Sequence, residues 1–139
     1  IGRRFREDEV RPEQQKITSA RDVVGIIMPQ MRDLKTEVFK VVYLNGNNRI
    51  IDISDAATGT VNQAMPIVRE NMHAALQKFA AAIICAHNHP SANITPSPED
   101  KKFTQELAAA GKLLGINVLD HIIIGGDEYF SFADSGMMT

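Results

Sequence analysis

The sequence predicts an α/β (α+β) domain in which a mixed β-sheet is flanked by helices. Short β-rich runs alternate with longer stretches of helical periodicity, and hairpin signals border this alternation on both sides. The composition is that of one globular domain, because 44% of the 139 residues are hydrophobic and 23% are charged. A chain of this length can bury about two-thirds of its unfolded surface in a single core.

Composition also limits the class of protein. Cys85 is the only cysteine, which excludes an internal disulfide framework and suits a reducing, cytoplasmic location. A net charge of -2 gives no overall electrostatic case for binding nucleic acid. No apolar run approaches the roughly 20 residues of a membrane-spanning helix, so we expect no membrane partner.

The chain divides into two parts of different character. Residues 1–16 carry five basic and four acidic side chains and few apolar anchors, which is typical of a linker or the end of a preceding helix. Residues 17–139 contain the periodic segments and form the predicted domain. Because the chain opens with Ile1 and shows no signal peptide, we expect it to be a piece of something longer.

The first half of the domain is predicted to be a helix followed by a hairpin. Ser19 is a suitable N-cap, and four apolar residues then follow at helical spacing: Val23, Ile27, Met31 and Leu34. Residues 37–44 and 49–53 are β-rich. The Asn-Gly step in the intervening "NGNN" favours the positive φ angles of a tight turn.

The second half alternates helix and strand before a closing hairpin. A helix is expected over 66–78, with Val68, Met72, Ala75 and Phe79 on its apolar face. Residues 80–86 are typical of a buried strand. A second helix over 98–114 would bury Phe103, Leu107 and Leu114 and end at Gly115. Residues 116–125 and 128–133 complete the sheet.

Two histidines follow the predicted buried strand, in "HNHPSANITPSPED" (87–100). Alternate residues of a strand share one face, so His87 and His89 can share one ion. Asp100, in the first turn of the next helix, can add an oxygen ligand and leave a fourth position for water. That is the arrangement of a catalytic zinc site, although other divalent ions would bind the same set.

The same segment also has a purely structural interpretation. Ser97 is a typical N-cap, Pro98 suits the first helical position, and acidic Glu99 and Asp100 suit the positive end of the helix dipole. A polar turn leading into a well-capped helix would use these residue types. Spacing alone leaves the two interpretations open.

The residues resemble a known family. His87-x-His89-Pro90 followed by Ser97-x-x-Asp100, with ten residues between His89 and Asp100, is similar to the signature of JAMM (MPN+ or JAB) metalloproteases. The string "AAAIICAHNHPSA…TPSPED…GKLLGINVLDHIIIG…YFSFADSGM" more closely resembles the bacterial RadC branch. This resemblance covers essentially the whole chain. It implies a JAB/MPN-like (cytidine-deaminase-like) fold, with a helix-hairpin-helix-like segment before it.

The resemblance also implies roles for individual residues. His87, His89 and Asp100 would be the metal ligands of a Zn²⁺ site, and Glu37 would be the general base that takes a proton from the attacking water. Ser97 would steady the oxyanion, or serve as an N-cap only. Taken without the resemblance, Glu37 is an ordinary surface residue beside a strand.

One residue departs from the family pattern next to these groups. RadC sequences usually have glycine where this chain has Ala92. If this position requires a positive φ, alanine there must rearrange or strain the loop.

Other polar residues have two interpretations each. Glu70 is a rival base or half of a surface salt bridge. His121 is a supporting residue of the metal site or a hydrogen-bonded core residue, and Cys85 is a metal neighbour or a small buried residue.

Three functions are therefore compared. The first is a zinc-dependent hydrolase acting on a peptide or isopeptide bond, with a peptide or protein as substrate. The second is a metal-binding or metal-free interaction module, and the third is a DNA-repair-associated factor, which would bind DNA. An exposed hairpin edge also allows a homodimer.

Overall fold

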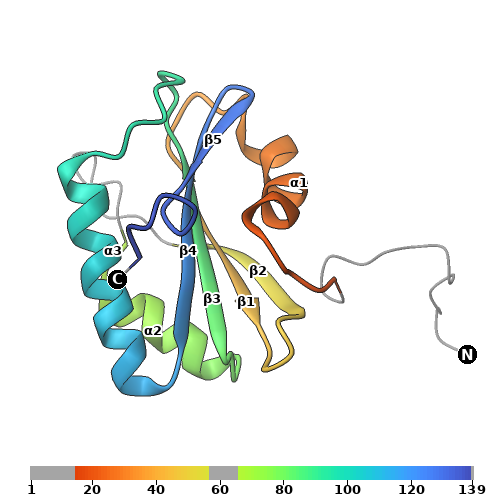
Figure 1. The fold of residues 1–139 in the computed structure, drawn as a ribbon, viewed down its shortest axis with the longest axis vertical. Coiled ribbons are helices and arrows are strands. Elements are labelled where there is room, and N and C mark those ends of the chain that lie inside the picture. The colour runs from red at the N-terminus through yellow and green to blue at the C-terminus, as the bar shows by residue number, and fades with distance from the viewer. Residues whose placement is uncertain (1–14, 57–65, 139) are drawn as a thin grey trace, which may run out of the picture.

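The computed structural model describes residues 15–56 and 66–138, which form one sheet with helices on both sides (Figure 1). Residues 1–14, most of the predicted linker, lie outside the described residues. The helices are α1 (Ala20–Met31), α2 (Val68–Gln77) and α3 (Pro98–Leu114), and the strands are β1 (Phe39–Leu44), β2 (Ile50–Ala56), β3 (Ala82–Asn88), β4 (Asn117–Gly125) and β5 (Glu128–Ser131).

The sheet is mixed, as the sequence predicted. Its strand order is β2-β1-β3-β4-β5. The central pair β3 and β4 is parallel and is connected through α3, whereas β1 pairs antiparallel with both β2 and β3, and β5 pairs antiparallel with β4. The predicted fold class is confirmed.

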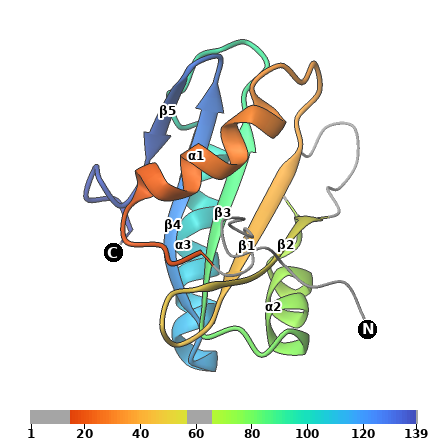
Figure 2. The same cartoon turned by 90° about the vertical axis from the view of Figure 1, so that its right-hand side faces the viewer.

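Both faces of the sheet are covered, which gives the domain two core layers. In Figure 2, α1 crosses one face, and α2 and α3 lie behind the other. Successive residues of one strand enter different layers: Val42 and Leu44 join the cluster beneath α1, whereas Val41 and Tyr43 join the cluster beneath α2 and α3. The sheet is thus buried on both sides at its centre.

The first hairpin forms as predicted, but its turn uses a different residue. The positive φ of 60° belongs to Asn48, and Gly46 is not among the positive-φ residues. The side chain of Asn45 accepts hydrogen bonds from the backbone N–H groups of Asn47 and Arg49, which closes the loop. Asparagine tolerates the left-handed region well, so the Asn-Gly step is not where the turn reverses.

Three apolar residues predicted to be buried are exposed, each at a helix end: Leu34 (37%), Phe79 (91%) and Leu114 (48%). Phe79 has a φ of 54° and turns the chain away after α2, and Ala80 donates its N–H to Ala75 O and takes the buried place. Leu114 directly precedes Gly115, whose left-handed conformation ends α3 as predicted.

Helix length and polarity are ordinary throughout the described part of the chain. None of the helices there is long and apolar enough to cross a membrane.

Candidate metal centre

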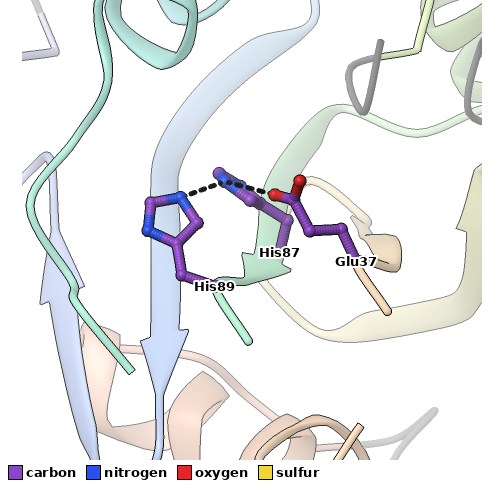
Figure 3. Close-up of side chains that lie close together, drawn as sticks. All are labelled: Glu37, His87 and His89. Carbon is purple, nitrogen blue, oxygen red and sulfur yellow. Dashed lines mark hydrogen bonds and ion pairs between the residues drawn. The ribbon is translucent and has the colours of Figure 1, made fainter. Parts of the chain in front are cut away.

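Antiparallel pairing of β1 with β3 sets Phe39 opposite His87. Glu37, just before β1, therefore lies beside the residues that end β3. Figure 3 shows that the side chains of Glu37, His87 and His89 lie close together. The sequence placed Glu37 at the start of the strand, whereas β1 begins two residues later, at Phe39. The register of one strand pair thus brings together groups 50 residues apart.

The site is compact. The Nε2 atoms of His87 and His89 are 3.0 Å apart. The Asp100 carboxylate lies 3.2 Å from His87 Nε2 through Oδ1 and 3.3 Å from His89 Nε2 through Oδ2. Glu37 Oε1 is 4.0 Å from His87 Nε2, and Glu37, His87 and His89 offer ligand atoms that all lie within 4.8 Å of one another. Every residue predicted to bind or serve the metal, except Ser97, is in this group.

The protonation of His89 can be read from its other nitrogen. His89 Nδ1 lies 2.6 Å from the backbone carbonyl of Asn93. A carbonyl only accepts hydrogen bonds, so Nδ1 carries a proton, and in the neutral ring Nε2 has the lone pair that a metal would use. Two imidazole nitrogens at 3.0 Å beside carboxylate oxygens repel one another unless a cation or proton lies between them. The donor set therefore fits a metal ion.

The start of α3 has the N-cap residue that the sequence predicted, Ser97, and it forms a full capping box. Ser97 Oγ accepts from the Asp100 N–H at 3.0 Å, and Asp100 Oδ2 accepts from the Ser97 N–H at 2.8 Å. The cap turns the Asp100 carboxylate inward, where it is 2% exposed. Capping and proximity to the histidines are thus satisfied by the same conformation.

Asp100 stays ionised in this environment. Burial acts to raise the pKa of Asp100, but the hydrogen bond and charge of His87 and the hydrogen bonds of Ser97 outweigh it, so the pKa lies below its ordinary value. A buried carboxylate that remains charged is a strong ligand for a cation.

Asn88, between the two histidines, has a role that sequence reasoning missed. Its side chain accepts from the Val38 N–H at 2.7 Å and donates to the Thr36 carbonyl at 3.0 Å. These bonds hold the backbone on either side of Glu37. The only signal for this role in the sequence was that residue 88 has an amide side chain. Nothing in the sequence shows that residues 36–38 lie opposite Asn88.

His121 is buried and hydrogen-bonded, and it contacts His87 of the metal centre, so its position is compatible with both interpretations made from the sequence. It is 1% exposed, and its two ring nitrogens contact His87 and Thr104. Burial lowers the pKa of His121 well below its ordinary value, and the nearby His87 lowers it further. The ring is therefore neutral.

A pocket of about 720 Å³ opens beside the metal centre. Its lining includes Glu37, His89, Ser97 and Asp100, together with apolar Ile67 and Phe103. Ser97 Oγ accepts its cap bond with a lone pair, and within the described residues its own proton has no acceptor. The Ser97 hydroxyl is thus available to donate toward the pocket.

The rival polar residues lie elsewhere. Glu70 and His73 are exposed on α2, and neither lines the pocket. Cys85 is fully buried in the core layer beneath α2 and α3, as the structural interpretation predicted. Burial raises the pKa of its thiol, which keeps it neutral.

The loop after His89 has the strain that the departure from glycine predicted. Ala92 has a φ of 69°, a left-handed conformation that disfavours any residue with a Cβ. Its carbonyl packs on Gly125, where an added Cβ would lie 2.8 Å from Ala92 O and 2.7 Å from Ile94 Cγ2. Ala92 therefore bears the strain of this left-handed conformation.

Replacing Ala92 with glycine should therefore stabilise the domain. We expect the free energy of unfolding to rise by about 0.5–1 kcal/mol, because relief of the left-handed strain exceeds the entropy cost of glycine. Urea unfolding of the metal-free protein measures this. Ala109→Gly, on the exposed side of α3, is the matched control and should destabilise by a similar amount. Two variants that both destabilise would contradict the assignment of strain.

Comparison with known proteins shows the family of this chain. The family model of the RadC-like JAB domain matches residues 17–137, and the chain belongs to this family. It is 45% identical over 120 residues to a UPF0758 protein of Caldanaerobacter subterraneus, covering 86% of this chain and 52% of the relative. A UPF0758 protein of Staphylococcus haemolyticus is 46% identical over 121 residues, covering 87% and 53%.

A third relative matches almost the full chain. The UPF0758 protein of Trichlorobacter lovleyi is 40% identical over 138 residues, which cover 99% of this chain and 60% of the relative. The chain thus spans about half to three-fifths of the length of these curated relatives. Their names state no activity.

Proposed function

We propose that this domain is a zinc-dependent hydrolase that cleaves a peptide or isopeptide bond. The observation that carries the proposal is the convergence of two imidazole nitrogens and a buried, ionised carboxylate on one point. A more exposed carboxylate, Glu37, stands beside that point at the edge of a pocket. Membership of the RadC-like JAB family supports the same reaction class.

In this proposal His87, His89 and Asp100 hold the metal. Their nitrogen and oxygen donors form the three-residue set typical of catalytic zinc sites, which leave a position open. When bound, zinc would lower the pKa of a water molecule to about 7 and would polarise the scissile carbonyl.

Glu37 acts as the proton carrier. Its side chain is 37% exposed, so it can meet both water and substrate. It takes a proton from the water as the oxygen attacks the carbonyl carbon, and then gives it to the leaving nitrogen as the C–N bond breaks. The products are a carboxylic acid, which retains the second proton of the water until it ionises in solution, and an amine, and Glu37 is ionised again.

Ser97 donates to the carbonyl oxygen while negative charge develops there. Ser97 lines the same pocket as Glu37, and its hydroxyl proton is available to donate. Such a donor stabilises the transition state by about 3 kcal/mol. Capping and donation use different parts of the hydroxyl, so one residue serves both.

The reaction is tested by tracing the oxygen of water. Zinc-loaded protein is incubated in ¹⁸O-labelled water with a peptide library and a pair of peptides joined through a lysine side chain. Hydrolysis places one ¹⁸O atom in each new carboxyl group, which mass spectrometry detects. We expect labelled termini with zinc-loaded protein and none with metal-free protein. Bound zinc without any labelled product would favour the non-catalytic interaction module.

Two substitutions at Ser97 separate its two roles. Ser97→Ala removes both cap and donor, whereas Ser97→Gly keeps much of the capping preference. We expect both variants to lower turnover by about 100- to 1,000-fold, with Ser97→Ala alone losing about 1 kcal/mol of stability. Turnover of a labelled peptide and urea unfolding measure the two effects. Full turnover in Ser97→Gly would leave Ser97 as a cap only.

A further inference from the structure

His87 is linked to helix α3 by a series of buried hydrogen bonds. His87 Nδ1 lies 2.8 Å from His121 Nε2 on β4, and His121 Nδ1 lies 2.6 Å from Thr104 Oγ1 on α3. Thr104 Oγ1 then donates to the backbone carbonyl of Asp100 at 2.7 Å. The Thr104–His121–His87 series thus ends at the backbone of another residue of the metal centre.

The end of the series determines where every proton lies. The Asp100 carbonyl only accepts, so the 2.7 Å contact requires the Thr104 hydroxyl proton. Thr104 Oγ1 must then accept from His121, which puts the His121 proton on Nδ1. His121 Nε2 is left with a lone pair and accepts from His87 Nδ1–H. When His87 is neutral, its remaining nitrogen, Nε2, therefore has a lone pair toward His89 and Asp100, where a metal ion would bind.

The reverse order of protons leaves the Asp100 carbonyl without a donor and puts a proton where a metal ion would bind. If Thr104 donated to His121 instead, no proton would lie between Thr104 Oγ1 and the Asp100 carbonyl, two acceptors 2.7 Å apart. His87 would also carry its proton on Nε2, in the middle of the donor set. A proton there competes with a metal ion for the same position.

We propose that Thr104 and His121 are positioning residues that hold His87 in the tautomer able to bind metal through Nε2. This inference rests on the metal centre of the proposed function, and it adds two residues to which the hydrolase proposal gives no role. It explains why β4 contributes a histidine inside an apolar strand. Neither residue is among those that line the pocket.

The surroundings keep the series rigid and dry. His87 and His121 are each 1% exposed and Thr104 is 2% exposed, so bulk water cannot supply an alternative partner. Phe132 stacks on His121 with ring centroids 4.9 Å apart, and Phe39 stacks on His87 at 5.9 Å, both with planes inclined by 10°. Rotation of either ring would break these contacts.

Thr104→Val tests the inference, because it keeps the shape of the side chain and removes its hydroxyl. We expect the zinc dissociation constant, measured by competition with a chromogenic chelator, to rise about 10- to 100-fold, the usual effect of losing a partner that orients a ligand. Thr104→Ser restores the hydroxyl and should bind zinc within about threefold of the wild type. Equal zinc affinity in the valine variant and the wild type would overturn the inference.

A second measurement needs no variant. Ring ¹⁵N chemical shifts of the zinc-loaded wild type report which nitrogen of His121 carries the proton. We expect Nδ1, and a proton on Nε2 would overturn the inference even if Thr104→Val did not fold. A wild-type protein that folds but binds no zinc would instead contradict the proposed function, so the two failures are distinguishable.

Discussion

Replacing Glu37 with glutamine should lower peptide hydrolysis by about 100- to 10,000-fold while zinc remains bound, because a positioned general base contributes that much to the rate. The amide has nearly the same shape but cannot take the proton of the attacking water. The donor atoms of His87, His89 and Asp100 are unchanged, so metal affinity should stay within about threefold. Turnover of the zinc-loaded variant and chelator competition measure the two quantities.

Glu70→Gln is the matched control, because Glu70 was the rival base in the sequence and lies exposed on α2. It should leave turnover unchanged. Normal turnover in the Glu37 variant, or a large loss in the Glu70 variant, would contradict the assignment of the base.

Replacing His89 with alanine should remove zinc and hydrolysis together. His89 Nε2 faces both His87 and Asp100, and its loss leaves two protein ligands where catalytic zinc sites use three. We expect zinc affinity to fall by more than the 10- to 100-fold that follows loss of a residue that only orients a ligand. Metal content after gel filtration and turnover are measured on the same sample.

His73→Ala is the control for this substitution, because His73 is an exposed histidine on α2. It should retain zinc and full turnover. Bound zinc with normal turnover in the His89 variant would contradict the proposed site.

The local patterns of the sequence predicted most of the fold. Strand alternation, the hairpins and the start of α3 depend on neighbours within a few residues, which a sequence displays directly. The errors lie at helix ends: Phe79 and Leu114 continue the apolar period but are exposed. Periodicity does not show where the chain turns away, since Phe79 adopts a left-handed conformation that is unusual for an aromatic residue.

Part of the candidate site could also be predicted from local patterns in the sequence. His87 and His89 are two residues apart on one strand, and Asp100 follows from capping rules, so local reasoning found all three. Glu37 required the family resemblance, because its approach to His87 depends on the β1–β3 register.

The supporting residues could not be predicted. Thr104 reaches His121 only because α3 packs on the parallel pair β3 and β4, and Asn88 reaches Thr36 only because β3 pairs with β1. Long-range packing of this kind leaves no local signal in the sequence.

The central claim is that His87, His89 and Asp100 hold zinc and that Glu37 does not. A crystal structure of the zinc-loaded protein, with anomalous diffraction recorded at the zinc absorption edge, tests it directly. The account predicts one anomalous peak about 2.0–2.2 Å from both Nε2 atoms and from one oxygen of Asp100, with the Glu37 carboxylate next to the open position. A peak bonded to Glu37 in place of Asp100, or no peak between the two histidines, would contradict it.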